Sequence, residues 1–239
     1  MEYITSSDFH FKDTAVALGK FEGIHRGHQL LMDEVKKQEL HGLRSVVFTF
    51  DRPTRLTLTG DTEYKQIYTK KERREILEKR GIDILIEHPF TKEFAALTPD
   101  RFIREVLVEK VGAKVIVVGT DFHFGKNRSG SITDLEKLEE ECGYHLIVVE
   151  KLQLNGKDIS STRIRASLEK GAMEEAKALL GRNYSVSGEI LHGNALGRTI
   201  QVPTINQQVP SFKLLPPNGV YVSKIHWKDE VYYGITNIG

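Results

Sequence analysis

The chain has 239 residues, of which 39% are hydrophobic and 28% charged, a composition typical of a folded globular protein rather than a disordered or fibrous one. Its formal net charge of +1 argues against nucleic-acid binding, which requires neutralising many phosphates, but is compatible with a small phosphorylated ligand. The single cysteine excludes an internal disulfide, and since we find neither a signal peptide nor an apolar run of membrane-spanning length, we expect a cytoplasmic protein that does not enter a membrane.

The first 150 residues alternate short apolar runs with amphipathic stretches, which is the pattern of a parallel sheet covered by helices on both faces. Two further helical stretches, within residues 161–182, close this unit. We therefore predict a Rossmann-like, doubly wound α/β domain over residues 1–180, with ligands bound at the carboxyl ends of its strands. The expected strands are residues 14–19, 44–50, 82–87, 114–119 and 145–149, and the expected helices between them are residues 28–42, 69–81, 99–112 and 132–143.

The first chemical motif, GKFEGIHRGHQLLMDEV, directly follows the first expected strand. It puts Gly19, Gly23 and Gly27, with His25 and His28, between the end of a strand and the start of a helix. Backbone N–H groups at a helix N-terminus, glycines that admit a phosphate and two converging imidazoles together make a triphosphate site. A histidine that is protonated or donates a hydrogen bond stabilises charge developing on phosphate oxygens. The alternative is a tight turn with incidental surface histidines.

Another motif lies near the end of the first domain. This motif, KDISSTRIRASLEKG, places two hydroxyls and two arginines at the start of a helix. Ser161 and Thr162 are expected to cap this helix and to donate to phosphate oxygens. Arg163 and Arg165 offer the planar donor fork that suits phosphate. The alternative is an ordinary capped helix with basic surface residues.

Between these two motifs, VIVVGTDFHFGKNRSGS carries an apolar strand into an aromatic, glycine-rich loop. Asp121, Phe122, Phe124 and Arg128 are candidates for the lining of a pocket that holds a planar ring and its phosphate. Alternatively, Phe122 and Phe124 anchor the loop in the core.

The chain changes character at residue 181, where shorter and more polar strand-like runs begin, separated by Gly, Pro and Asn turns. Residues 184–193, 219–227 and 230–239 have this character. They predict a second, antiparallel β domain over residues 181–239.

Taken together, the motifs resemble known families. The pattern HxGH at residues 25–28 resembles the signature of the HxGH nucleotidyltransferase superfamily, and ISSTxxR at residues 159–165 resembles its element for the β and γ phosphates. Residues 119–130 are similar to GxDFxFGxxRxG of bacterial FAD synthetases. Residues from 181 onward look like the riboflavin kinase module of the bifunctional bacterial enzymes.

The resemblance implies transfer of AMP from ATP to FMN, giving FAD and pyrophosphate, with Mg bridging phosphate oxygens. Because no nucleophilic side chain is placed for a covalent intermediate, we expect direct attack by the FMN phosphate, with catalysis by positioning and electrostatics. The implied catalytic residues are His25, His28 and Arg165, the ATP-binding residues are Gly19, Phe21, Gly23, Gly27, Ser161, Thr162 and Arg163, and the flavin-binding residues are Asp121, Phe122, Phe124 and Arg128.

For the kinase-like module, the resemblance places Gly193, Gly197 and Arg198 in a phosphate loop and gives Thr204 and Asn206 to Mg and nucleotide phosphate. The family module continues with more strands, a helix and a catalytic acidic residue after the point where this chain ends. We therefore expect an incomplete β-barrel and do not expect riboflavin phosphorylation from these residues, whether the chain is a fragment or carries a remnant of the module.

Two departures from the family pattern bear on the acceptor. Glu22 stands where the family usually has aspartate, and residues 50–57 read FDRPTRLT where it has a histidine and proline. Alternatives are therefore an acceptor such as pantetheine phosphate, nicotinate mononucleotide or, with CTP, glycerol phosphate. A flavin-binding regulatory protein is the alternative from another class.

Overall fold

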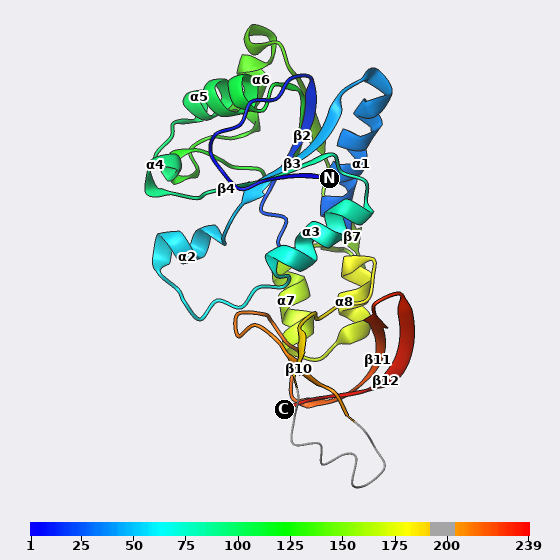
Figure 1. Ribbon diagram of the computed structural model, residues 1–239. Helices are drawn as coiled ribbons and strands as arrows, with labels where there is room; N and C mark the ends of the chain where they lie inside the picture. The colour runs from blue at the N-terminus through cyan, green and yellow to red at the C-terminus, as the bar shows by residue number, and fades with distance from the viewer. Residues whose placement is uncertain (192–203) are drawn as a thin grey trace.

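The computed structural model describes residues 1–191 and 204–239 of the chain (Figure 1). A six-stranded parallel sheet in the order β1-β4-β3-β2-β5-β6 lies at its centre. All five expected strands are present, and β1 is an additional edge strand that is too short to show a pattern in the sequence. The strands are β1 (Glu2–Ile4), β2 (Thr14–Leu18), β3 (Arg44–Phe50), β4 (Ile84–His88), β5 (Ala113–Gly119) and β6 (His145–Val149).

The strand order reverses beside β2. The chain moves outward from β2 through β3 to β4, and then returns to place β5 on the other side of β2. In the register, Val16 lies between Val46 of β3 and Ile116 of β5. Loops that leave the carboxyl ends of β2 and β5 diverge to opposite faces, which opens a crevice there. The expected doubly wound fold is confirmed.

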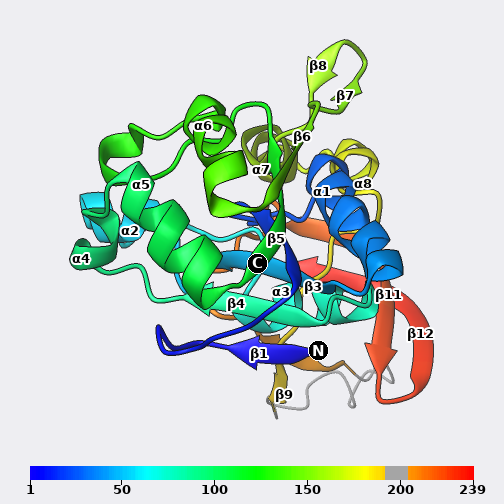
Figure 2. The same ribbon diagram turned by 90° about the horizontal axis from the view of Figure 1, so that it is seen from above.

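Alternate residues of β2 pack on opposite faces of the sheet, as its completely buried sequence TAVAL requires. Val16 and Leu18 join a core formed with η2 (Phe102–Lys110), a π-helix, and α6 (Ile132–Cys142). Ala15 and Ala17 pack beneath α1 (Arg26–Lys37) and α3 (Lys70–Lys79). Figure 2 shows α6 on one side of the molecule and α1 on the other.

The remaining short elements lie in connections, except for two that belong to expected helices: residues 38–41 end the stretch 28–42, and residues 99–101 begin the stretch 99–112. Helical turns form η1 (Gln38–His41), α2 (Thr54–Thr59), α4 (Lys92–Ala95), α5 (Pro99–Arg101) and η3 (Lys126–Arg128). A two-stranded hairpin of β7 (Gln153–Leu154) and β8 (Lys157–Asp158) projects from the molecule after β6 (Figure 2).

A third core joins segments that are far apart in the sequence. Helices α7 (Ser161–Glu169) and α8 (Met173–Leu180) lie below the sheet (Figure 1) and supply Ile164, Leu168 and Leu179. Ile67, from the segment before α3, and Leu214, from the C-terminal region, complete the cluster. The C-terminal region therefore contributes to the packing of the first domain.

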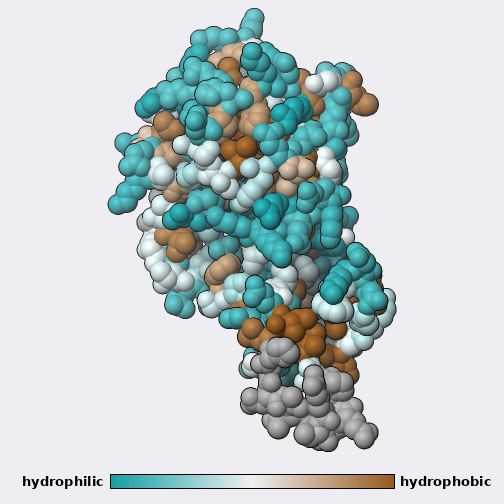
Figure 3. All heavy atoms as spheres, in the orientation of Figure 1, coloured by the Kyte–Doolittle hydropathy of each residue, from teal (hydrophilic) through white to brown (hydrophobic). Residues whose placement is uncertain are grey.

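Where the sequence led us to expect an incomplete β-barrel, the described C-terminal residues form two separate antiparallel pairs that do not close into a barrel. One pair is β9 (Glu189–Leu191) with β10 (Asn206–Gln208), and the other is β11 (Gly219–Trp227) with β12 (Glu230–Ile238). Neither β11 nor β12 contains a buried residue. Exposed apolar side chains such as Val222, at 91% exposure, lie on this hairpin. Figure 3 shows apolar surface gathered at the same end of the molecule.

Candidate active site

The loop between β2 and α1 holds two non-glycine residues in the left-handed backbone region. Phe21 has φ of 44° and Ile24 has φ of 41°. Both side chains are completely buried, so packing holds the backbone in a conformation that is unfavourable for residues with a Cβ. This conformation turns the chain from the strand end into the start of the helix, where the two histidines lie.

His25 and His28 stack on each other at the start of α1. Their ring centroids are 3.6 Å apart with an interplanar angle of 17°, and Phe21 meets the His28 ring edge-on at 5.0 Å. His25 is the N-cap of α1, because its Nδ1 accepts a hydrogen bond of 3.2 Å from the His28 backbone N–H. A neutral ring that accepts at Nδ1 carries its proton on Nε2, which is then free to donate. Nδ1 of His28 is buried without a hydrogen-bond partner among the described residues.

Both histidines are neutral at pH 7 in the ligand-free protein. Burial lowers the pKa of His25 to about 4, the charge of Arg182 adds to this effect and Asp121 opposes it. Burial, followed by His25 and Arg182, lowers the pKa of His28 well below its ordinary value. Of the two states that the sequence left open, the structure therefore favours the neutral hydrogen-bond donor before a phosphate binds.

The motif glycines allow close packing around these rings. A Cβ on Gly27 would lie 3.2 Å from His25 Nδ1, and one on Gly19 would lie 2.9 Å from the Phe21 ring. A Cβ on Gly23 would lie 3.7 Å from the Ser161 hydroxyl oxygen, so the first motif passes directly over the start of α7. These contacts explain the glycines through packing as well as through phosphate access.

The ISST motif meets the histidine loop, although the capping residue differs from the expectation. Ser160 is the N-cap of α7, and its hydroxyl accepts from the Arg163 N–H at 3.2 Å. Ser161 and Thr162 are the first helical residues and do not cap the helix, which corrects the sequence-based assignment. Their side chains are thus not committed to the cap and can serve a ligand at the helix N-terminus.

Arg165 links the two motifs through an ion pair. Its guanidinium donates to the Glu22 carboxylate, both side chains are less than one-fifth exposed, and the guanidinium lies 4.3 Å from the Tyr64 ring centroid. The Tyr64 hydroxyl also donates to Glu22 at 2.8 Å, and the Ile67 N–H does so at 3.3 Å. A glutamate at position 22 is therefore long enough to reach this arginine.

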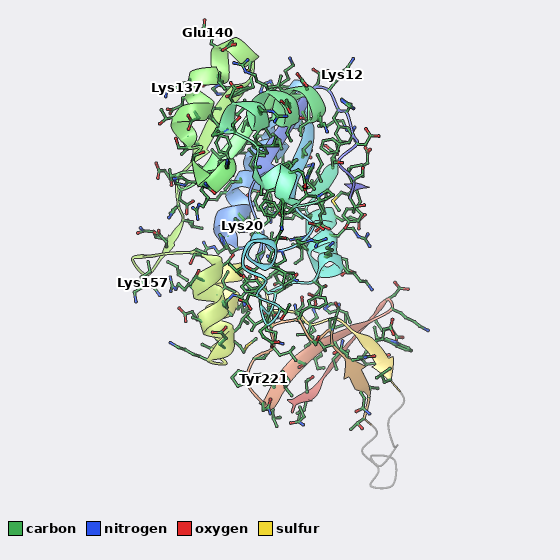
Figure 4. All side chains as sticks on the ribbon, turned by 90° about the vertical axis from the view of Figure 1, so that its left-hand side faces the viewer. Lys12, Lys20, Lys137, Glu140, Lys157 and Tyr221 are labelled. Carbon is green, nitrogen blue, oxygen red and sulfur yellow. The ribbon has the colours of Figure 1, made fainter. Side chains whose placement is uncertain are left out.

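Arg163, in contrast, is committed to structural contacts. It donates to Glu175 at 3.0 and 3.1 Å and to the carbonyls of Leu154 and Lys157 at 2.9 and 3.2 Å. It therefore fastens the β7–β8 hairpin to α8. Figure 4 shows Lys157 far to the side of Lys20. Phosphate binding by Arg163, predicted from the sequence, would require it to leave these contacts.

The loop after β5 brings a carboxylate to the crevice and buries an aromatic ring. Asp121 is exposed, pairs with Lys151 at 3.1 Å and acts electrostatically on His25. Phe124 is 7% exposed, with its ring centroid 5.4 Å from that of Phe102 and 5.5 Å from that of half-buried Phe122. This burial supports the alternative in which Phe124 anchors the loop in the core, while its contact with flavin stays a prediction.

A cavity of about 60 Å³ beside the histidine loop is lined by residues for which no role was predicted. Lys20 lies two residues after the end of β2 and near the middle of the molecule in Figure 4. Burial, together with the charge of Arg128, lowers the pKa of Lys20, while Glu22 opposes the shift, so the predicted residue Arg128 acts on this cavity. The cavity is also lined by Glu22, Thr49, Phe50, Arg52, Pro53, Thr54, Tyr64, Gln66, Tyr68 and Arg73.

One feature of the sequence pointed to this cavity. Arg52 and Pro53 lie in the stretch that departs from the family pattern, and both line it. Asp51 holds this stretch in place, since it pairs with Arg52 and accepts from the Phe90 N–H at 3.0 Å. Tyr64 comes from a segment without any recognisable pattern and Arg73 from an expected helix without a chemical motif, so both were missed.

Of the residues predicted for the kinase-like module, only some lie in the described part of the chain. Gly193, Gly197 and Arg198 lie outside the described residues, whereas Thr204 and Asn206 are exposed, and Asn206 pairs with Leu191 across β9 and β10. No group of three or more histidine, cysteine or acidic residues in the described part of the chain is arranged to hold a metal ion.

Within residues 1–191 and 204–239, no helix combines the length and apolar character needed to cross a bilayer.

Two family models match this chain. Residues 8–163 match the family model for FAD synthetase and residues 180–239 match the one for riboflavin kinase. A bifunctional riboflavin kinase/FMN adenylyltransferase from Listeria monocytogenes is 34% identical over 99% of this chain and 75% of its own length. Its counterpart from Bacillus subtilis is 36% identical over 95% and 72%, respectively.

A solved structure shares the fold. It is described as a macrolide-efflux protein from Streptococcus pneumoniae and matches 100% of this chain and 79% of its own, with a TM-score of 0.90 and 30% sequence identity. The match of the first family model covers most of the chain, and the motifs that define the predicted site meet at the switch point of the sheet. The chain therefore belongs to the FAD synthetase family, with part of a riboflavin kinase domain at residues 180–239.

Proposed function

We propose that this chain binds ATP in the crevice beyond β2 and β5 and transfers its AMP to the phosphate of FMN, giving FAD and pyrophosphate. The observation that carries this proposal is the meeting of the two phosphate motifs. Glu22 of the histidine loop pairs with Arg165 of the ISST helix, and Gly23 lies against Ser161. Groups separated by more than a hundred residues thus surround one site at a helix N-terminus.

In the proposed reaction, an oxygen of the FMN phosphate forms a bond to the α phosphorus of ATP as the bond to the bridging oxygen breaks. The electron pair leaves with pyrophosphate. His25 and His28 donate hydrogen bonds to oxygens that gain charge, and their ring protons remain on the protein. Ser161, Thr162 and Arg165 hold the leaving pyrophosphate, for which Arg165 exchanges its contact with Glu22 for a contact with phosphate.

The flavin half of FMN is proposed to lie between the loop after β5 and the cavity beside Lys20. Asp121, Phe122 and Arg128 offer a carboxylate, a partly exposed ring and a cation on one side. Lys20 and Arg52 line the other side. The basic character of this cavity suits an acceptor that brings its own phosphate.

Magnesium is proposed to arrive with ATP. Mg²⁺ keeps much of its water and binds substrate phosphates with few protein ligands, which fits a site without a cluster of acidic residues in the described part of the chain. When bound, the ion neutralises charge on the phosphates. Thr204 and Asn206 remain candidates for a second ion in the kinase-like region.

The test is FAD formation and pyrophosphate release with ATP, Mg²⁺ and FMN, run beside an assay in which riboflavin replaces FMN. FAD from FMN and none from riboflavin would confirm adenylyl transfer without kinase activity in this chain. FAD from both would add riboflavin phosphorylation. Flavin binding without pyrophosphate release from either would reject the enzyme in favour of a flavin-binding protein.

A further inference from the structure

Arg182 lies just beyond α8, within the part of the chain that matches the riboflavin kinase model, yet it contacts the histidine loop. Its Nη1 donates to the carbonyls of Ile24 at 2.8 Å and Leu180 at 3.2 Å. Its Nη2 donates to the carbonyl of Gly23 at 3.0 Å. One planar guanidinium thus holds two consecutive loop carbonyls and the end of α8.

These carbonyls belong to the residues immediately before His25. Ile24 has a left-handed backbone, so this part of the loop is the part that most requires support. Gln29 provides a second support, because its Nε2 donates to Ile24 O at 2.9 Å and to Leu180 O at 2.8 Å. The fork of Arg182 cannot be replaced by a lysine, which has a single nitrogen and no fixed geometry.

A buried cluster fixes the segment that carries Arg182. Lys213 is 3% exposed, and its Nζ donates to Glu72 at 2.7 Å, to Ile67 O at 2.7 Å and to Ser185 O at 2.9 Å. The Tyr184 hydroxyl donates to Ile67 O at 2.8 Å. Residues on either side of the undescribed stretch are therefore held against α3 and the segment before it.

Residues 212–214 provide a second connection to the phosphate motifs, through Gln66 and Ile67. Gln66 forms a parallel bridge with Lys213, its N–H donates to Phe212 O at 2.6 Å, and its carbonyl accepts from the Leu214 N–H at 2.8 Å. The next residue, Ile67, donates its N–H to Glu22, the partner of Arg165. Two independent contacts thus connect the kinase-like region with the proposed AMP-transfer site.

We propose that Arg182 is a positioning residue for AMP transfer, holding Gly23 and Ile24 so that His25 and His28 face the ATP phosphates. The first stretch of the kinase-like region is then a working part of the transferase site. This inference rests on the proposed function, because the effect of Arg182 on the position of the loop is measured as the rate of FAD synthesis.

The charge of Arg182 gives a second readout that does not depend on turnover. It lowers the pKa of both His25 and His28. The other charged or titratable groups that act on these rings are Asp121, which raises the pKa of His25, and His25 itself, which lowers that of His28. Removing the charge of Arg182 should therefore raise the pKa of both rings.

The experiment compares Arg182→Gln and Arg182→Lys with wild type. We expect kcat for FAD synthesis from FMN to fall roughly a hundredfold in both, because misplacing a catalytic group by about 1 Å has this effect. The histidine pKa values, followed by NMR of the ring C–H groups, should rise in Arg182→Gln and stay low in Arg182→Lys, which keeps the charge. Arg104→Gln, at an arginine that pairs with Asp100 and Glu141 away from the site, is the matched control.

Wild-type kcat in Arg182→Lys would overturn the proposal. So would ring resonances of His25 and His28 that remain at their wild-type positions in both variants, whatever the activity. If Arg182→Gln does not fold, the kcat of Arg182→Lys alone decides. If wild type makes no FAD from FMN, the proposed function fails, while the resonances still report whether Arg182 positions the loop.

Discussion

At His25, one hydrogen bond determines where the ring proton lies. Because Nδ1 accepts from the His28 N–H, the neutral ring presents Nε2–H to a ligand, and the stacked His28 ring is held in parallel. Because both rings are buried and neutral, no charged side chain has to be desolvated before they donate hydrogen bonds to a phosphate. This arrangement matches preorganised stabilisation of the transition state.

Replacing His28 by alanine removes one of these donors and the stacking partner of His25. We expect kcat to fall by about a hundredfold or more, as is typical when a donor to a developing negative charge is lost. Steady-state assays of pyrophosphate release measure this effect. His145→Ala, at an exposed histidine paired with Glu139, is the control and should keep wild-type turnover. Unchanged kcat in His28→Ala would remove His28 from the mechanism.

The low pKa of His25 predicts how stability depends on pH. Its pKa is about 4 in the folded protein and ordinarily 6.5, so between these values the unfolded chain binds a proton that the native protein does not. Above pH 6.5 this difference in proton binding has no effect on stability. As the pH falls from 6.5 towards 4, the free energy of unfolding decreases by about 3 kcal/mol in total because of this group.

Urea unfolding of wild type and His25→Asn between pH 8 and pH 4.5 measures this effect. At pH 8 the histidine is neutral in both states, so that measurement sets the reference for the substitution itself. The wild-type free energy of unfolding should then decrease more steeply towards acid than that of the variant. Parallel curves would show that His25 is not buried as described.

At the level of elements, the order of strands and helices follows from the sequence because buried parallel strands read as short apolar runs. Elements of two or three residues, such as β1 and the β7–β8 hairpin, are too short to show a periodicity. The cap of α7 was assigned one residue too late, since Ser160 and Ser161 are chemically the same and only geometry separates them. Burial of Phe124 was an open alternative that only packing decided.

The buried Lys213–Glu72 ion pair supports a prediction at this level. Both side chains are at most 4% exposed, and Glu72 also completes the capping box of α3 with Thr69. Lys213→Met leaves a buried carboxylate without its cation, so we expect a loss of about 3–5 kcal/mol in the free energy of unfolding. Equilibrium unfolding in urea measures this loss.

Two comparisons separate this effect from simple loss of a lysine. Lys224→Met, on the exposed hairpin strand β11, should change stability by no more than about 0.5 kcal/mol. The double variant Lys213→Met with Glu72→Gln should recover part of the loss, because the unpaired charge is gone. A stability in Lys213→Met equal to that of Lys224→Met would contradict the buried pair.

For the whole molecule, the sequence located the change of character at residue 181 but not the way in which the two parts join. A composition shift shows where strands replace helices, whereas contacts of Arg182, Tyr184 and Lys213 across the junction have no local pattern. The incomplete barrel was expected from the resemblance alone, because no short stretch of sequence determines which distant strands pair.

The described strands also predict uneven stability across the molecule. The β11–β12 hairpin has no buried residue, while β2 and β4 are buried throughout. An isolated hairpin is marginally stable in water, so local opening should occur far more often there than in the sheet. Hydrogen exchange followed by mass spectrometry should show peptides from residues 219–238 exchanging long before those from residues 113–119. Equal protection would mean that something covers the hairpin.

The hydrogen bonds from Arg182 to the carbonyls of Gly23 and Ile24 have a consequence for the redesign of this protein. Family boundaries suggest grafting a different module after α8, at residue 180. A graft at that point would discard the guanidinium that supports the turn before His25 and the lysine that anchors Glu72. A chimera that retains residues 181–187 and 211–214 would inherit both, so the useful splice site follows the contacts and not the boundary between homologous segments.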